Sequence, residues 1–251
     1  MKIALSLNEM SHSGSIRRAN ARSLRAWVSR LVPFVFLLLP AYALTAYVLL
    51  PAAWHRCASR AIVPTTHPIS YTAEGIPADP INVAFLGTRA EVIAAMKAAG
   101  WALADPITVR SGLRDAHSVL FDRSYPSAPM STHYLARRPQ DLAFEQSAGR
   151  SPRRRHHIRL WRMSVPSPGQ AVWLGAATYD RGLGMSRFTG EVMHHIDPNV
   201  DTERSKLVAD LLTTRRVDKL RILPGTEVTA SLNGGGDFYR SDGKILVAVL
   251  R

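Results

Sequence analysis

Hydrophobic and polar positions follow two periods along the chain, one typical of strands and the other typical of helices. The apolar run INVAFL at residues 81–86 predicts a buried strand. Thr88 and Glu91 then have the spacing of a capping box, which predicts a helix over residues 89–99 with one apolar face. Gly100 is expected to end this helix, because glycine readily adopts the left-handed backbone of a C-terminal cap.

The remaining pattern predicts a chain in which strands outnumber helices. Further strands are predicted at residues 132–136, 141–146, 156–162, 171–179, 190–196, 217–223, 226–232 and 245–250, with turns at residues 137–140 and 180–184. A helix after residue 198 and a helix at residues 113–121 are also predicted, and the latter would turn Leu113, Leu120 and Phe121 inward. Because short turns join several strands, the predicted fold class is α+β, with a mainly antiparallel sheet and helices on one face.

An apolar segment of twenty residues, 31–50, lies near the N-terminus and contains no charged residue. Twenty helical residues match the roughly 30 Å hydrocarbon core of a bilayer, so a single transmembrane helix is expected. Arginines precede it, which places the N-terminus in the cytoplasm. A cleaved signal peptide, with Ala41-Tyr42-Ala43 as its cleavage site, is the alternative. The expected organisation is a basic cytoplasmic tail (1–30), a transmembrane helix (31–54), an extended linker (55–78) and an extracytoplasmic domain (79–251).

Composition and charge narrow the possible partners. The chain has a formal net charge of +13, but five of these excess charges lie in residues 1–30. The globular part is therefore only moderately basic, which argues against a nucleic-acid partner. The single cysteine, Cys57, excludes an internal disulfide and a cysteine-based zinc site.

Several ordered segments carry a family resemblance. They are DPINVAFLGTRAEVIAAMKAAGWALADPIT, YPSAPMSTHYLARRPQDLAFEQSAGRSPRRRHHIRLW, VWLGAATYDRGLG and HHIDPNVDTER. Together they resemble the LssY-like C-terminal domain family of bacteria, over most of residues 79–212. The resemblance implies an uncharacterised module that often follows a membrane phosphatase of the phosphatidic-acid type. Here a single membrane helix, expected in the bacterial inner membrane, replaces that polytopic part. No catalytic residue is transferred, so the resemblance does not decide whether the chain is an enzyme.

Two histidine doublets, His156-His157 and His194-His195, are the most unusual polar features of the domain. Each lies in a predicted strand, where neighbouring side chains point to opposite faces, so neither doublet can bind one ligand with both members. The apolar neighbours predict that His156 and His194 point inward. By the same alternation, His157 and His195 would share a polar face.

Arginines near these histidines predict an anion-binding site. Its expected lining is Arg155, His157, Arg159 and His195, with Arg181 nearby. Arginine forks bind phosphate and carboxylate in a bidentate manner, so the expected ligand is a phospholipid head group or a phosphorylated envelope glycan. This binding or accessory function needs no cofactor.

Two other interpretations of the same residues stay open. A divalent metal held by His157, His195 and Asp197 would activate water in a hydrolase. Alternatively the histidines are structural, and Asp197 is the N-cap of the following helix with Pro198 at its first position. A structural subunit that binds a membrane protein is a third class of function.

Overall fold

The computed structural model describes residues 34–50, 52–53, 69–149, 151–163, 171–225 and 229–251. The chain divides into two compact units, Met1–Leu49 and Leu50–Arg251. In the first unit the described residues are helical and include a π-helical turn, η1 (Thr45–Leu49). Among the described residues, no helix has both the length and the apolar character needed to cross a bilayer. The predicted cytoplasmic tail and most of the predicted linker lie outside the described residues.

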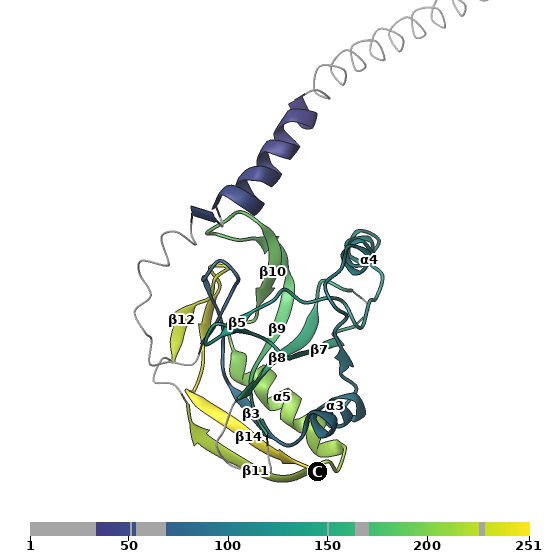
Figure 1. Ribbon diagram of the computed structural model, residues 1–251, viewed down its shortest axis with the longest axis vertical. Coiled ribbons are helices and arrows are strands. Elements are labelled where there is room, and N and C mark those ends of the chain that lie inside the picture. Colours follow the sequence, from purple (N-terminus) through teal and green to yellow (C-terminus); the bar gives the residue numbers. More distant parts are fainter. Residues whose placement is uncertain (1–33, 51, 54–68, 150, 164–170, 226–228) are drawn as a thin grey trace, which may run out of the picture. The chain divides into compact units, whose positions relative to one another are not determined.

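An eight-stranded sheet organises the second unit (Figure 1). Its path runs through β11 (Val217–Pro224), β14 (Lys244–Leu250), β3 (Val83–Leu86), β9 (Val172–Met185), β8 (Arg155–Met163), β7 (Leu142–Ser147) and β4 (Ala102–Leu103), and β10 (Val192–Ile196) pairs with β9. Among the described strands of this sheet, every pairing is antiparallel except that of β14 with β3. The α+β class with mainly antiparallel sheets is therefore confirmed.

Two smaller sheets complete the described part of this unit. One has the order β2 (Pro77–Pro80), β1 (Ile69–Tyr71), β5 (Tyr134–Leu135) and β6 (Arg138–Pro139), and the other pairs β12 (Ala230–Leu232) with β13 (Phe238–Arg240). The first sheet matters most for the site, because Asp79 of β2 reaches Arg159 of β8.

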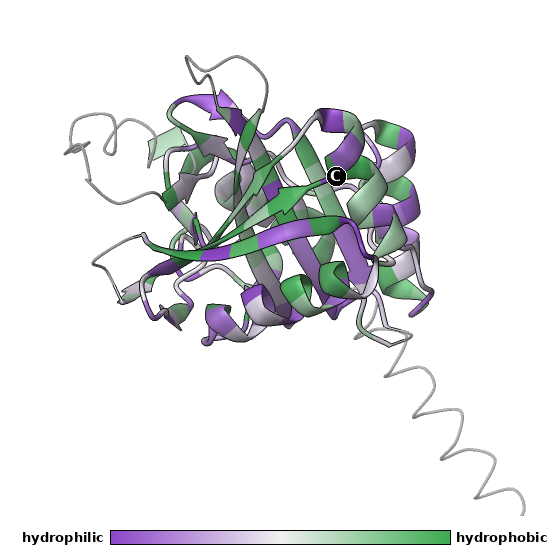
Figure 2. Cartoon of the chain, turned by 90° about the horizontal axis from the view of Figure 1, so that it is seen from below, coloured by the Kyte–Doolittle hydropathy of each residue, from purple (hydrophilic) through white to green (hydrophobic). Residues whose placement is uncertain are grey.

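The main core lies between the large sheet and two helices, α3 (Arg89–Ala98) and α5 (Val200–Thr213). Met96 of α3 and Leu207 of α5 belong to the same buried cluster as Phe85 and Ile158 of the strands. Burial of such side chains is the main stabilising contribution to a domain of this size. The sequence KILVAVL of β14 is almost wholly hydrophobic, as expected of a strand flanked on both sides (Figure 2).

Helix starts agree with the predictions at α3 and differ at the other two helices. The capping box of α3 is present, with reciprocal hydrogen bonds between Thr88 and Glu91. Helix α4 (Val109–Leu120) begins earlier than predicted, because Thr108 and Ser111 form a second capping box. The N-cap of α5 is Asn199, so the prediction that Asp197 caps this helix was wrong.

One predicted hairpin pairing and one predicted turn were also wrong. The predicted hairpin around residues 137–140 is confined to the short strands β5 and β6, whereas β7 pairs with β8 and β4. Residues 180–184, predicted as a turn, continue β9, because β10 folds back and pairs with them. Pairing with the next strand outweighs the turn preference of two glycines.

Two glycines test how tightly the core is packed. A Cβ at Gly175 would lie 2.6 Å from Cγ2 of Val83 and 2.8 Å from Cδ2 of Leu160, both of which are buried. We therefore expect Gly175→Ala to lower the free energy of unfolding by about 1–3 kcal/mol. The control is Gly112→Ala in α4, where a Cβ meets nothing within 4 Å. It should leave stability unchanged or raise it by up to about 1 kcal/mol. Urea denaturation followed by tryptophan fluorescence would measure both, and equal stabilities would contradict the packing described.

Candidate functional site

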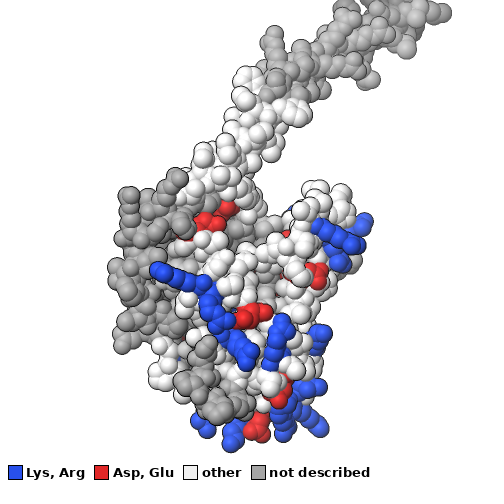
Figure 3. All heavy atoms as spheres, in the orientation of Figure 1, with Lys and Arg blue, Asp and Glu red and all other residues white. Residues whose placement is uncertain are grey.

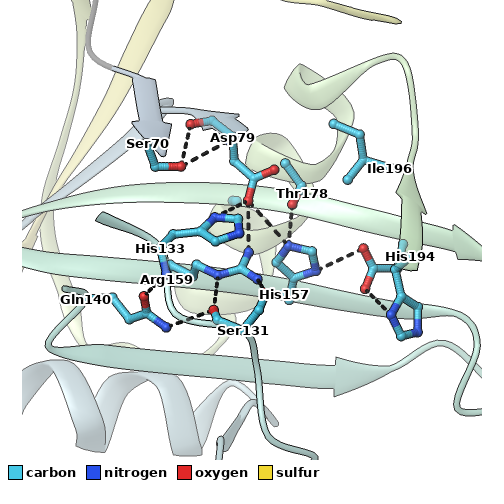
Figure 4. A network of polar contacts seen from close by, with 12 residues as sticks. Ser70, Asp79, Ser131, His133, Gln140, His157, Arg159, Thr178, His194 and Ile196 are labelled. Carbon is cyan, nitrogen blue, oxygen red and sulfur yellow. Dashed lines mark hydrogen bonds and ion pairs between the residues drawn. The ribbon is translucent and has the colours of Figure 1, made fainter. Parts of the chain in front are cut away.

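A row of buried ionisable side chains crosses the face of the sheet turned away from α3 and α5 (Figure 4). Along β8, His157 and Arg159 alternate with Ile158 and Leu160, which belong to the core under the helices. Both polar side chains are buried. Their partners must come from the protein itself, since an unpaired buried charge is strongly unfavourable.

Asp79 of β2 is the first of these partners. Its Oδ2 accepts a hydrogen bond of 2.8 Å from Nη1 of Arg159 and lies 3.4 Å from Nδ1 of His133. Ser70 holds the backbone of Asp79 through two hydrogen bonds of 3.0 Å. Burial by itself raises the pKa of Asp79, but hydrogen bonds from two histidines and the charge of Arg159 hold it well below its usual value. The ionised Asp79 therefore ties the small sheet to the large one.

Asp180 of β9 is the second partner. Its Oδ1 lies 3.3 Å from Nδ1 of His157, and its Oδ2 accepts a hydrogen bond of 3.0 Å from Nε of Arg155. Burial raises the pKa of Asp180, but the neighbouring positive charges, first that of His157, lower it below its usual value. Burial lowers the pKa of His157, but Asp180 and then Asp79 outweigh burial and raise it. The imidazolium form of His157 is thus stabilised between two carboxylates.

Glu145 of β7 ends the row. Its Oε2 accepts a hydrogen bond of 2.9 Å from Nη1 of Arg155, and its Oε1 accepts one of 2.6 Å from the backbone N–H of Ala128. Burial raises the pKa of Glu145 to about 7, although Arg155 favours the ionised form. The side chains of Arg155 and Arg159 are 12% and 6% exposed. The chain's own carboxylates therefore lie where the predicted anionic ligand would bind these two arginines.

A hydroxyl, an imidazole and a carboxylate follow one another in this row. Oγ1 of Thr178 lies 2.5 Å from Nε2 of His157, whose other ring nitrogen faces Asp180. A nucleophilic site can have the same order of groups, but the imidazolium form of His157 donates from Nε2 to the hydroxyl and cannot take up its proton. Thr178 is fully buried, so a substrate cannot reach the hydroxyl in this conformation.

A β-bulge decides which histidine of the second doublet reaches the buried row. The register of β10 on β9 shifts between His195 and Ile196, which leaves Arg181 as an extra residue on β9. The structure therefore brings His194, rather than the predicted His195, to the buried row. Nδ1 of His194 lies 4.0 Å from Oδ2 of Asp180, and burial lowers the pKa of His194 to about 4.

His156 points to the opposite face of the sheet, as the alternation predicts. Its Nδ1 lies 2.7 Å from Oε2 of Glu203, which is buried on α5. Its ring also lies against Tyr179, with 4.8 Å between the ring centroids. The two histidines of the first doublet therefore face opposite sides of the sheet, His156 towards Glu203 and His157 towards Asp180.

His195 belongs to a more exposed cluster beside the glycine-rich loop that precedes β13. Its Nδ1 lies 2.7 Å from Oδ1 of Asp237, and Nη2 of Arg181 lies 3.8 Å from the same oxygen. The side chains of His195 and Arg181 are 21% and 53% exposed. Arg187 is exposed too, and its stem lies over Gly236, where an added Cβ would come within 2.9 Å of three of its carbons. We call Arg181, Arg187, His195 and Asp237 the Asp237 corner.

The loop holds the carboxylate of Asp237 in a fixed direction. Oδ1 of Asn233 accepts hydrogen bonds from the backbone N–H groups of Gly235 and Asp237, at 3.0 and 2.8 Å. Oδ2 of Asp237 accepts a further one of 3.1 Å from the backbone N–H of Ile196. The ring of His195 lies over Gly184, where a Cβ would collide with Nε2. An Nδ1–H directed at a carboxylate leaves Nε2 as the ring nitrogen that can contact a ligand.

The structure divides the residues predicted to bind a ligand into two groups. It gathers Arg181 and His195 in the Asp237 corner and places Arg155, His157 and Arg159 in the buried row. Each arginine of the buried row is paired with carboxylates of the chain, so the pair formed by the exposed Arg181 and the partly exposed His195 is the better candidate.

The predicted metal ligands are not brought together. His157 faces Asp180 and His195 faces Asp237. Oδ1 of Asp197 instead accepts a hydrogen bond of 2.8 Å from the backbone N–H of Asn199. Within the part of the chain that the structure describes, no group of three or more histidine, cysteine, aspartate or glutamate side chains is arranged to hold a metal ion.

Asp180 was expected near the anion-binding site, but the pairing of Asp180 and Asp237 with histidines was not predicted from the sequence. Asp180 falls in a predicted turn, and Asp237 follows a run of three glycines, so neither has a visible partner. The balance of charge could have indicated that such acids exist. Arg155 and Arg159 alternate with core residues in a strand, and buried arginines need acids beside them.

This fold and site define a small α+β domain with internally paired histidines. Residues 61–245 match the family described as LssY C-terminus, so the chain belongs to that family. No curated protein and no solved structure matches the chain.

The buried row has a pH-dependent contribution to stability. Asp79 and Asp180 have lowered pKa values, so their contribution is present above the unfolded-state pKa of about 4 and is lost as the pH falls. We expect Asp180→Asn to lower the free energy of unfolding at pH 7 by about 3–5 kcal/mol and to reduce its loss between pH 5 and 3. The exposed Asp218→Asn is the control and should change stability by less than about 0.5 kcal/mol. Denaturant unfolding across this pH range tests the expectation, which an unaltered pH dependence in the Asp180 variant would refute.

Proposed function

We propose that this chain is a membrane-anchored protein of the bacterial envelope whose C-terminal domain binds an anionic, phosphorylated group at the Asp237 corner. One observation carries the proposal. Arg181 and His195, which are far from Asp237 in sequence, meet the same carboxylate, while Arg181 remains exposed and His195 partly exposed. The arginines of the buried row, by contrast, are already paired within the domain.

The charges of the Asp237 corner favour an anion. The corner holds two exposed arginines, Arg181 near the carboxylate of Asp237 and Arg187 over the adjoining Gly236, so it has an excess of positive charge even when His195 is neutral. Guanidinium groups bind phosphate through paired N–H donors, and an imidazolium held by a carboxylate at Nδ1 would add an Nε2–H donor. A phospholipid head group and a phosphorylated glycan share this phosphate chemistry.

The proposed location rests on the N-terminal sequence. Residues 31–50 are uncharged, and the arginines before them outnumber those that follow closely. We propose an inner-membrane anchor with the N-terminus in the cytoplasm and the domain outside it. Protease added to spheroplasts should then digest the domain; a domain that stays intact until the cells are lysed would contradict this orientation.

Binding of glycerol phosphate to the full chain in detergent tests the Asp237 corner. Arg181→Ala should weaken binding at least about tenfold, because a hydrogen bond to a charged group contributes about 1.5–3 kcal/mol. Calorimetric titration is the measurement, with the exposed Arg221→Ala on β11 as the charge-matched control. Equal affinities for both variants, or no binding by the unaltered chain, would refute the proposal.

Two glycines of β9 allow a second test of the Asp237 corner, with substitutions that leave the charge of the chain unchanged. A Cβ at Gly184 would displace the ring of His195, whereas a Cβ at Gly182 meets nothing within 4 Å. Gly184→Ala should therefore weaken glycerol phosphate binding, and Gly182→Ala should not. If both variants bind alike, His195 does not contribute to the site.

A further inference from the structure

Helix α4 has its polar side turned inward and its apolar side turned outward. Val109, Leu113 and Leu120 are 82%, 68% and 73% exposed, while Ser111 and Ser118 are buried. With about 100° between successive residues, the three apolar side chains fall within an arc of about 40°, roughly opposite the two serines. The serine hydroxyls donate to backbone carbonyls of Pro106 and Asp115, so the hydrogen-bonding groups of these two buried side chains are satisfied.

This arrangement is the reverse of the predicted one. Leu113, Leu120 and Phe121 were expected to face the core, as in an ordinary surface helix. Ile107 before the helix and Phe121 after it extend the exposed apolar side at its two ends. A contiguous apolar surface of this kind marks an interaction site, because single exposed side chains are common but a continuous row is not. We call the row formed by Ile107, Val109, Leu113, Leu120 and Phe121 the α4 ridge.

The charges beside the α4 ridge are mainly positive (Figure 3). Exposed arginines occur on the helix, just after it and in the neighbouring loop: Arg110, Arg114, Arg123, Arg153 and Arg154. The loop is adjacent, because Nη2 of Arg153 donates to the carbonyl of Val119 at 3.4 Å.

The two acids of this region offset only part of the charge of the five arginines. Asp115 is partly buried, and burial raises its pKa. Asp122 accepts a hydrogen bond of 2.7 Å from the hydroxyl of Ser151. The surface that the α4 ridge offers to a partner is therefore apolar in its centre and positive around it.

We infer that the α4 ridge docks on an anionic phospholipid bilayer, with α4 lying along the interface. An amphipathic helix in this position buries its apolar side among the acyl chains near the head groups, while its arginines meet the lipid phosphates. The inference is independent of the Asp237 corner, since it concerns different residues and a bilayer surface instead of one phosphate group. Charge complementarity favours this partner over a second copy of the chain, whose ridge would present like charges.

A depth-dependent label in the full chain tests the inference. In a Cys57→Ser background, Leu113→Cys carries a fluorophore on the α4 ridge, and Ile222→Cys carries it at an equally exposed site on β11. The chain is reconstituted in vesicles that contain brominated lipid and either phosphatidylglycerol with phosphatidylcholine or phosphatidylcholine alone. We expect quenching at residue 113 in the anionic vesicles and little at residue 222. Val109→Cys repeats the measurement if the first variant misfolds.

Charge variants distinguish docking on lipid from phosphate binding at the Asp237 corner and from self-association. Arg110→Gln with Arg123→Gln should lower the ratio of docked to undocked label about 30-fold, since each arginine near an anionic surface contributes about a factor of five. Arg181→Ala should leave docking unchanged, because that residue belongs to the Asp237 corner. Equal quenching at residues 113 and 222, or quenching indifferent to lipid charge, would overturn the inference. Shielding of residue 113 that grows with chain concentration in neutral vesicles would assign the α4 ridge to a second copy instead.

Discussion

Two buried carboxylates, those of Asp79 and Asp180, hold the non-helical face of this domain together. Each is paired with an arginine of β8, and His157 lies between them. Removing either carboxylate would leave buried positive charge less compensated in a region away from water, so the strands β2, β8 and β9 depend on one another. The same pairing draws Asp79 and its small sheet onto the large sheet, which buries the row further.

This internal pairing also limits where the domain can act. Arg155 and Arg159 have the right chemistry for an anionic ligand, but their donors are directed at carboxylates of the chain. We therefore assign the proposed binding to groups at the periphery, where the Asp237 corner presents charge and the α4 ridge presents apolar surface. Both would suit a domain that works beside anionic lipid, one by recognising a phosphate and the other by resting on the bilayer.

Much of the fold was predictable because it depends on local patterns. The strand at Val83–Leu86 and the capped helix that follows were found from a few adjacent residues, since burial of an apolar run and a capping box are short-range effects. The choice of pairing partner for each strand was not predictable in the same way. Residues 180–184 look like a turn until β10 pairs with them, and the predicted partner of β7 pairs elsewhere.

The sequence by itself determined the α+β class, the alternation of His156 and His157 and the presence of an arginine-rich strand, because each follows from local composition and a two-residue period. Only the tertiary structure decided what those side chains do. Because of a single bulge at Arg181, His194 and not His195 lies beside Asp180. Acids from other strands form ion pairs with Arg155 and Arg159 inside the domain. The orientation of α4 was decided in the same way, since a helical period defines an apolar side but does not say whether the core or a surface will receive it.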